Sequence, residues 1–285
     1  MVIRDLLAEG VKALSDLEFS DSSKESRIIL CHLLGKDESY LYAHGDEEIS
    51  EEAISDFRTI VDRRKNGEPL QYILGFQEFM GFEFLVKPGV LIPRGDTEFL
   101  VEAILNYAKK AFADNSFRML DIGAGSGAIS LSVAKLMKNS KIIAIDISSD
   151  AIALSNENKI KLNIDNAEFL QGNLFSALGE VHENSFDIIA SNPPYIPDEE
   201  IETLQAEVRL HEPKLALAGG KDGLDFYREI VNKSLKYLKK GGLLIFEVGH
   251  DQGEAVAVIM RNNGYDNIEI INDFENRNRV VSGRL

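Results

Sequence analysis

Apolar residues recur with two different spacings along the chain. Residues 1–74 show helical spacing only, with apolar positions three or four residues apart and polar residues between them. The two clearest stripes are Leu6, Leu7, Val11, Leu14 and Ile54, Phe57, Ile60, Val61. This first region is therefore predicted to be a small helical bundle.

Capping residues mark the predicted ends of the helices in this bundle. Ser22 followed by Glu25 matches a capping box and predicts a helix start, whereas Gly35 is typical of a helix end. Asn66 and Gly67 predict another helix end, before a short helix that begins near Pro69.

A change of spacing follows residue 74. The apolar residues Phe79, Phe82, Phe84 and Val86 lie around Gly81 in a pattern that predicts a short β-hairpin. Thr97, flanked by Asp96 and Glu98, is suited to begin the next helix. We therefore expect an N-terminal bundle over residues 1–74, a hairpin connector over 75–95 and a main domain over 96–285.

In the main domain, apolar strands alternate with amphipathic helices. The predicted strands cover residues 118–123, 141–148, 167–173, 186–192, 243–249, 267–273 and 279–285. Such alternation predicts an α/β fold with a doubly wound, seven-stranded parallel sheet, covered by helices on both faces. Ligands of such sheets bind beyond the carboxyl ends of the strands, where the motifs below fall.

A glycine loop follows the first of these strands. The segment LDIGAGSGAISL joins strand to helix through Gly123, Ala124, Gly125, Ser126 and Gly127. The glycines permit a tight turn and close approach to a ligand. Their G-x-G-x-G spacing is one residue short of the dinucleotide fingerprint, and no Gly-Lys-Ser/Thr phosphate loop is present.

Carboxylates flank this loop. Asp146 ends the second strand, where a carboxylate accepts hydrogen bonds from a ribose diol. The combination favours an adenosine-bearing cofactor without a phosphate chain, and Asp121 is placed to meet the positively charged methionine part of such a cofactor. Asn173 and Leu174, after the third strand, are candidates to contact an adenine, although the asparagine is equally suited to form its own turn.

The fourth strand ends in SNPPY, residues 191–195. Pro193 and Pro194 supply no N–H group, so the local backbone presents carbonyl acceptors. Asn192 adds a side-chain carbonyl, and Tyr195 a flat face against which a planar amide or a base can lie. Clamping both N–H bonds of an NH2 group directs its lone pair toward an electrophile, which predicts methyl transfer onto a planar nitrogen.

Composition limits the alternatives. The net charge of −16 disfavours a protein that grips a phosphate backbone. The single cysteine, Cys31, excludes an intramolecular disulfide and a thiolate metal cluster, and we expect no metal site. The absence of a long apolar run and of a basic leader favours a cytoplasmic protein without a membrane partner.

Five segments in order resemble one known family. They are GEPLQYILGFQEFMGFEF, VLIPRGDTEFLVE, LDIGAGSGAISL, SNPPYI and EVRLHEPKLALAGGKDGLDFYREI. The chain is similar to the peptide chain release factor N5-glutamine methyltransferases, a group of class I enzymes that use S-adenosylmethionine and have a Rossmann-like methyltransferase sheet. The last segment is the most specific, because adenine methyltransferases share only N-P-P-Y.

The resemblance implies particular roles. Asn192 and the Pro193 carbonyl would bind the amide of the glutamine in the Gly-Gly-Gln loop of class 1 peptide chain release factors, with Pro194 beside them and Tyr195 stacked on it. The cofactor roles would fall on residues 123–127, Asp146 and Asn192, with Asn173 and Leu174 as further candidates. Glu247 is also similar to the family, as either a structural carboxylate or a catalytic one.

Two other functions remain open from the sequence. The first is methylation of an exocyclic amine of adenine or guanine in nucleic acid, which the acidic charge disfavours. The second is a cofactor-binding scaffold without turnover, which would bind S-adenosylmethionine and give no methylated product.

Overall fold

The computed structural model describes residues 1–17, 20–113 and 115–285. These form two compact units, which are described separately. One comprises Met1–Phe76 together with Gln205–His211, and the other comprises Gln77–Leu204 and Glu212–Leu285. The segment 205–211 therefore belongs to the unit of the N-terminal residues, although the chain on either side of it belongs to the other unit.

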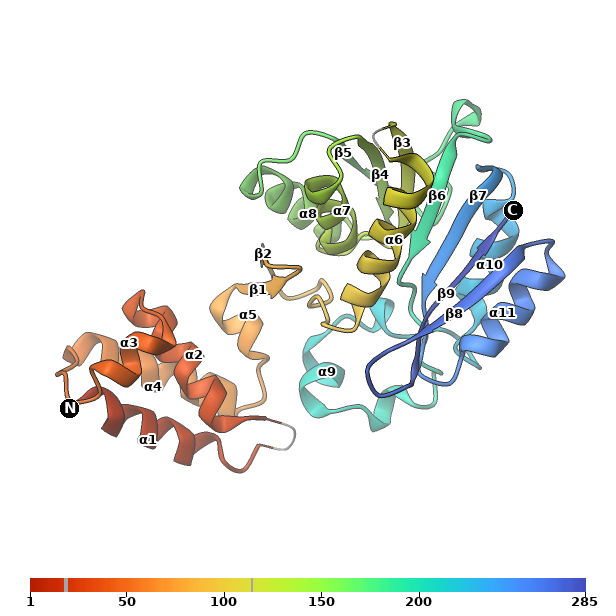
Figure 1. The fold of residues 1–285 in the computed structure, drawn as a ribbon. Coiled ribbons are helices and arrows are strands. Elements are labelled where there is room, and N and C mark those ends of the chain that lie inside the picture. Colours follow the sequence, from red (N-terminus) through yellow and green to blue (C-terminus); the bar gives the residue numbers. More distant parts are fainter. Residues whose placement is uncertain (18–19, 114) are drawn as a thin grey trace. The chain divides into compact units, whose positions relative to one another are not determined.

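The first unit is helical. Its helices are α1 (Ile3–Leu14), α2 (Ser22–Leu34), α3 (Glu38–Ala43), α4 (Glu51–Lys65), α5 (Leu70–Leu74) and α9 (Ala206–His211) (Figure 1). The stripes predicted for α1 and α4 supply its core, in which Leu6, Leu14 and Phe57 are almost fully buried. The predicted bundle is confirmed by this arrangement.

The start of α2 differs from the predicted capping box. Asp21, not Ser22, is the N-cap, and its carboxylate accepts a hydrogen bond of 2.9 Å from the Lys24 N–H. Glu25 does not return to the cap, because it pairs with Arg64 of α4. The predicted helix end at Gly35 is confirmed, since Gly35 has a φ of 62° and terminates α2.

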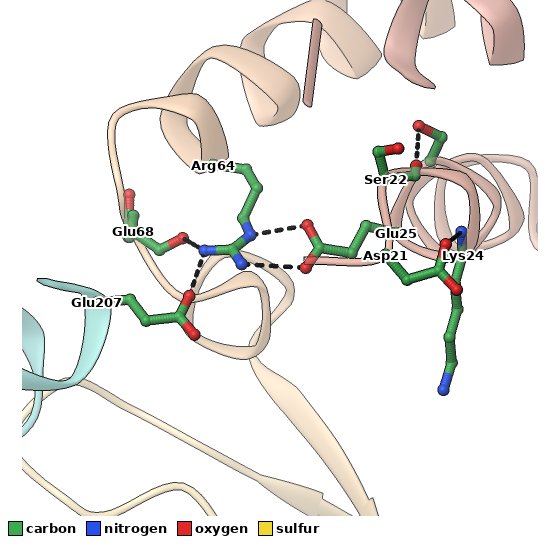
Figure 2. A network of polar contacts seen from close by, with 8 residues as sticks. Asp21, Ser22, Lys24, Glu25, Arg64, Glu68 and Glu207 are labelled. Carbon is green, nitrogen blue, oxygen red and sulfur yellow. Dashed lines mark hydrogen bonds and ion pairs between the residues drawn. The ribbon is translucent and has the colours of Figure 1, made fainter. Parts of the chain in front are cut away.

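Arg64 is the polar centre of the helical unit. Its guanidinium donates two hydrogen bonds to the Glu25 carboxylate, at 2.8 and 3.0 Å (Figure 2). It also donates to the Glu68 carbonyl at 3.3 Å and to the Glu207 carboxylate at 2.6 Å. Only 6% of the Arg64 side chain is exposed, so α2, α4 and α9 share one buried cation.

The second unit contains the main sheet. Its strands are β3 (Phe117–Ile122), β4 (Ser140–Asp146), β5 (Ala167–Gln171), β6 (Phe186–Ser191), β7 (Leu238–Glu247), β8 (Asp266–Asn272) and β9 (Asn278–Arg284). They lie in the order β5-β4-β3-β6-β7-β9-β8 (Figure 1). The predicted strands are confirmed, and β6 lies beside β3.

The strands at one edge of the sheet pair in antiparallel orientation. β9 pairs antiparallel with both β7 and β8, whereas β3 to β7 pair in parallel. The reason is the short connection between β8 and β9: a parallel pair needs a crossover of a dozen or more residues, and only Asp273–Arg277 joins these strands. The expectation of a wholly parallel sheet is corrected accordingly.

Helices cover both faces of this sheet. They are α6 (Thr97–Phe112), α7 (Ala128–Leu136), α8 (Ser149–Lys161), α10 (Asp225–Ser234) and α11 (Gly253–Asn262), with short turns η1 (Glu180–His182), η2 (Ile201–Thr203) and η3 (Lys214–Ala216). α6 and α7 pack against one face of β3, which presents Met119. α10 and α11 pack with the opposite face, which presents Leu120 and Ile122. Two buried clusters result, as the sequence pattern predicts.

The predicted hairpin consists of β1 (Phe76–Phe79) and β2 (Phe82–Leu85). Its turn has positive φ angles at Met80 (53°) and Gly81 (74°), the arrangement favoured in a tight two-residue hairpin. Phe79 and Phe84 are buried in the core shared with α6 and α7. Among the described residues, no helix has the length and apolar character needed to span a bilayer.

Candidate active site

A cavity of about 450 Å³ lies at the carboxyl ends of β3, β4, β5 and β6. Its volume is in the range of small-molecule sites. Eight residues selected from the sequence line it: Gly123, Gly125, Asp146, Asn173, Leu174, Asn192, Pro193 and Pro194. Residues that sequence reasoning missed complete the wall, among them Ile147, Leu215 and Phe226. The cavity thus brings together the glycine loop and the Asn-Pro-Pro segment.

The N–H groups at the start of the glycine loop donate hydrogen bonds to other groups of the protein. Gly123 and Ala124 both donate to the Ile145 carbonyl, at 2.8 and 3.0 Å. The Gly125 N–H donates to Asp146 Oδ2 at 2.8 Å. These donors are therefore engaged within the protein, which is unsuited to a pyrophosphate and agrees with the short glycine spacing.

Positive φ angles explain the glycines. Gly123 and Gly125 have φ of 83° and 55°, in the region that side chains other than glycine rarely adopt. A Cβ at Gly125 would meet no heavy atom within 4 Å, so the space beside it is open to the cavity. The loop forms a cradle whose surface is bare backbone.

Asp146 is fixed in position by two backbone donors. Its Oδ2 accepts from Gly125, and its Oδ1 accepts from the Ser148 N–H at 2.9 Å. Each carboxylate oxygen can accept more than one hydrogen bond, so acceptor capacity remains on the side that lines the cavity. Such a carboxylate is suited to bind hydroxyl groups.

Asn173 and Leu174 form the wall beyond β5. The Asn173 N–H is capped by Ser176 Oγ at 2.8 Å, and its exposed side chain lines the cavity. Leu174 is buried and has a φ of 50°, which is uncommon for a residue with a Cβ. Backbone strain of this kind is concentrated at functional sites. The pair offers one polar and one apolar contact to a flat ligand.

Asn192, Pro193 and Pro194 follow β6 directly. The Asn192 amide nitrogen Nδ2 donates to Thr97 Oγ1 at 3.2 Å. Among the described residues, no group donates to the backbone carbonyls of these three residues. All three residues line the cavity, and the role of their carbonyls as acceptors for a ligand stays a prediction.

Tyr195 lies differently from the other residues of this segment. It is partly buried against the core of α10 and α11 and does not line the cavity. Its carbonyl accepts from Gln252 Nε2 at 2.9 Å. Burial, reinforced by the nearby Glu247 carboxylate, raises the pKa of its hydroxyl above the ordinary range.

Asp121 is also outside the cavity lining. It lies two residues after Met119 and therefore on the same face of β3, which α7 covers, and it is fully buried. Ser130 Oγ of α7 donates to its Oδ2, and burial raises its pKa to about 7. Its side chain therefore lies behind the loop, and the predicted contact of Asp121 with the ligand stays a prediction.

The other loop residues are turned into the protein. Ala124 is buried with the α6 and α7 core, and the start of α7 encloses Gly127, whose Cβ would come within 2.9 Å of Leu131. The Ser126 carbonyl accepts from Asn158 Nδ2 at 2.9 Å. Ala124, Ser126 and Gly127 therefore shape the loop and do not line the cavity.

Asn158 is a residue that sequence reasoning missed. From α8 it also accepts from the Leu85 N–H at 2.7 Å and donates to the Leu85 carbonyl at 3.0 Å. It is fully buried and joins the hairpin to the glycine loop. No local sequence signal indicates this role, because its partners lie 32 and 73 residues away.

Replacing Asn158 by alanine is expected to lower the free energy of unfolding by about 1–3 kcal/mol, because buried backbone groups lose their partners. Urea unfolding measures this change. Asn156→Ala is the matched control, since the Asn156 side chain bonds, within the described part of the chain, only to the Ile152 carbonyl of its own helix. Equal destabilisation by the two variants would contradict the bracing role.

Two further polar residues lie behind Asn192. Thr97 begins α6, and Glu247 ends β7, the neighbour of β6. Glu247 is 1% exposed, and burial raises its pKa to about 7. Over the described ranges, no group of three or more His, Cys, Asp or Glu residues is arranged to hold a metal ion.

Comparison with known proteins gives concordant matches. The family described as "PrmC N-terminal domain" matches residues 5–75, and that described as "Methyltransferase domain" matches residues 113–276. A crystal structure of a methyltransferase from Pyrococcus furiosus shares the fold, with a TM-score of 0.53 at 17% identity over 72% of this chain and 89% of that one.

Curated relatives match over nearly the whole length. A protein from Clostridium acetobutylicum is 41% identical over 99% of this chain and 98% of its own. Another from Geobacter sulfurreducens is 42% identical, covering 92% of this chain and 89% of its own. Both are named release factor glutamine methyltransferase.

Proposed function

Because the chain belongs to the release factor glutamine methyltransferase family, we propose that it transfers a methyl group from S-adenosylmethionine to the side-chain amide nitrogen of a release factor glutamine. The observation that supports this most directly is the Asn-Pro-Pro segment, which presents carbonyl acceptors to the same cavity as the glycine loop. In this proposal the residues that bind the accepting amide lie beside the cofactor site.

The cavity fits this cofactor. Asp146 offers carboxylate oxygens to the ribose hydroxyls, and the bare backbone at Gly123 and Gly125 allows a ligand to approach closely. Leu174 and Asn173 would contact the adenine. When bound, S-adenosylmethionine supplies a methyl group activated by its sulfonium. The residues of the chain therefore need to bind the cofactor and the substrate amide, orient them and exclude water.

Asn192 and Pro193 orient the accepting nitrogen. An amide NH2 group has two N–H bonds, and the Asn192 side-chain carbonyl and the Pro193 backbone carbonyl provide one acceptor for each. With both bonds held, the nitrogen lone pair is directed out of the amide plane. Such alignment is equivalent to an effective concentration on the order of 10⁵ M or more.

Tyr195 and Pro194 have supporting roles in this proposal. Pro194 lines the cavity and fixes the backbone that carries the carbonyls. Tyr195 is partly buried behind the segment, so its proposed stacking on the substrate amide requires the substrate to reach the exposed part of the ring. Its buried hydroxyl stays protonated at physiological pH, because its pKa is raised.

We further propose that the glutamine is that of the Gly-Gly-Gln loop in class 1 peptide chain release factors, and that the reaction takes place in the cytoplasm, where it modulates translation termination. In this proposal residues 1–74 dock the protein substrate, 75–95 connect, and 96–285 catalyse. The net charge of −16 opposes a nucleic-acid substrate, because phosphate contacts depend on lysine and arginine.

The test supplies the purified protein with S-adenosylmethionine and, separately, a class 1 release factor, ribosomal RNA or DNA. Mass spectrometry of peptides and nucleosides then locates the added methyl group. A methyl on the Gly-Gly-Gln glutamine is expected. A methyl on nucleic acid alone would establish exocyclic amine methylation instead, and cofactor binding without any product would establish a scaffold.

Asp146→Asn is expected to weaken S-adenosylmethionine binding about 10- to 100-fold, because hydrogen bonds to a charged group contribute about 1.5–3 kcal/mol. Isothermal titration calorimetry measures the dissociation constant without turnover. Asp150→Asn is the control, since Asp150 is exposed on α8. If Asp146→Asn binds S-adenosylmethionine with unchanged affinity, Asp146 does not bind the ribose.

A further inference from the structure

The direction of the Asn192 amide is a chemical problem that the fold must solve. Rotation of an asparagine amide by 180° exchanges its oxygen and its NH2 group with almost no change of shape. In the proposed function the oxygen must face the substrate NH2 group, since two NH2 groups facing each other have no acceptor between them. Only the partners on the inner side of Asn192 can set this direction.

Thr97 is the partner on that side. Asn192 Nδ2 donates to Thr97 Oγ1 at 3.2 Å, across 95 residues of sequence. A hydroxyl can both donate and accept, so Thr97 alone would accept either orientation of the amide. Thr97 can help to set the direction only if its own hydroxyl proton is already donated to another acceptor.

Glu247 provides that commitment. The parallel register pairs Ser191 with Phe246, so the next residues, Asn192 and Glu247, end neighbouring strands. Hydrogen bonding with the Thr97 and Asn192 side chains stabilises the Glu247 carboxylate, which otherwise has its charge disfavoured by burial. An ionised carboxylate only accepts. The Thr97 proton then points to Glu247, and the Thr97 lone pair points to Asn192.

The nearby cation Arg279 forms its ion pairs with other carboxylates, so the Glu247 carboxylate keeps acceptor capacity for Thr97. Arg279 donates to Asp273 at 3.0 Å and lies 3.2 Å from Asp96, and no ion pair between Arg279 and Glu247 is formed. The Oε2 atom of Glu247 has no hydrogen-bond partner among the described residues. A buried carboxylate with spare acceptor capacity is unfavourable for stability alone, which points to a functional reason for it.

We infer that Thr97 and Glu247 are positioning residues, which form a directional hydrogen-bond chain from Asn192 through Thr97 to Glu247 and hold the Asn192 carbonyl toward the substrate. The inference rests on the proposed function for its catalytic consequence. The direction of the chain is a property of the free protein and can be measured without turnover.

The kinetic test uses variants of closely similar size. Thr97→Val removes the Thr97 hydroxyl and leaves Glu247 as the acceptor for Asn192 on this side. It is expected to lower kcat about tenfold, while KM for the release factor and the cofactor dissociation constant change less than about twofold. Thr97→Ser restores the hydroxyl and should restore kcat. Thr203→Val is the control, because the Thr203 hydroxyl, as far as the structure describes the chain, bonds only to the Glu200 carbonyl.

A double-mutant cycle separates positioning from general structure. If Thr97 acts through Asn192, Thr97→Val should have almost no further effect in the Asn192→Ala background. A further tenfold loss there would overturn the inference. Glu247→Gln should reproduce the effect of Thr97→Val, because a glutamine amide can also donate and therefore no longer fixes the direction of the chain.

The pH profile gives a second readout. Glu247 has a pKa of about 7, so the acceptor-only form is lost as the pH falls through 7, and kcat should fall with it. The charged and titratable groups around it are Asp96, Arg279, Tyr195 and Tyr227, and the pKa values of the last three are raised. The pKa of Asp121 is also raised to about 7, so a fall in kcat near pH 7 does not by itself identify Glu247. The expected result is that the part of this fall caused by Glu247 disappears in Glu247→Gln. An unchanged profile would contradict the inference.

The Asn192 side-chain NH2 group provides a spectroscopic readout. In protein labelled with ¹⁵N-asparagine, its resonance should shift as the pH crosses 7, and the shift should vanish in Glu247→Gln. Absence of the shift in the unsubstituted protein overturns the inference even if methyl transfer is found. Conversely, failure of methyl transfer with the shift present refutes the proposed function and leaves the hydrogen-bond chain standing.

Discussion

Asn192→Ala is expected to lower kcat for release factor methylation by about 10²- to 10³-fold, the loss that follows removal of one preorganised catalytic hydrogen-bonding group. The cause is the loss of one of the two acceptors that orient the substrate NH2 group. S-adenosylmethionine affinity should change less than about threefold, because Asp146 and the glycine loop remain in place. Single-turnover kinetics and calorimetry measure the two quantities separately.

Asn173→Ala is the matched control for this substitution. Both asparagines line the cavity at a strand end, but Asn173 lies beyond β5 and not beside the Pro-Pro segment. Its loss should weaken cofactor binding modestly and leave kcat at saturating cofactor close to normal. If Asn192→Ala lost cofactor affinity and turnover by the same factor, the assignment of Asn192 to the substrate would fail.

Arg64→Met is expected to lower the free energy of unfolding of the helical unit by about 3 kcal/mol, near the lower end of the range for breaking a buried ion pair. Burial by itself would lower the pKa of the Arg64 guanidinium, but Glu25 and Glu207 more than compensate and raise it. Without Arg64, both carboxylates lose their cation in a partly buried place. Chemical unfolding followed by circular dichroism measures the change.

The neighbouring arginine provides the control. Arg63 pairs with Glu68 at the surface, with 47% of its side chain exposed. Arg63→Met should therefore change the unfolding free energy by no more than about 1 kcal/mol, as is usual for exposed pairs. The prediction for Arg64 is wrong if the two substitutions destabilise to the same extent.

Sequence periodicity predicted the parts of the site that strand ends determine. Gly123 and Asn192 each follow a parallel strand and Asp146 ends one, and the carboxyl ends of such strands meet at one edge of the sheet. The wall formed by Leu215 of η3 and Phe226 of α10 was missed, because the position of these two elements over the strand ends depends on tertiary contacts. Local patterns do not specify such a position.

The direction of a side chain and its hydrogen-bond partners were harder to predict than the place of the residue along a strand or helix. β3 is buried on both faces, so alternation along it gives no polar face to show which way Asp121 points. The capping box failed for a related reason: Asp21 and Ser22 are both good N-caps, and Glu25 is drawn to Arg64, 39 residues away. Thr97 and Asn158 likewise act through partners that lie far along the chain.

The membership of α9 in the helical unit changes how the protein can be dissected. The chain passes between the two units three times, after Phe76, after Leu204 and after His211. A fragment that ends at residue 76 would lack α9 and would leave Arg64 without Glu207, while a fragment that starts at residue 77 would carry α9 with no bundle to pack on. Cleavage at a single peptide bond therefore cannot release either unit intact, so a truncation that abolishes activity would report damage to the fold as readily as the loss of a docking surface.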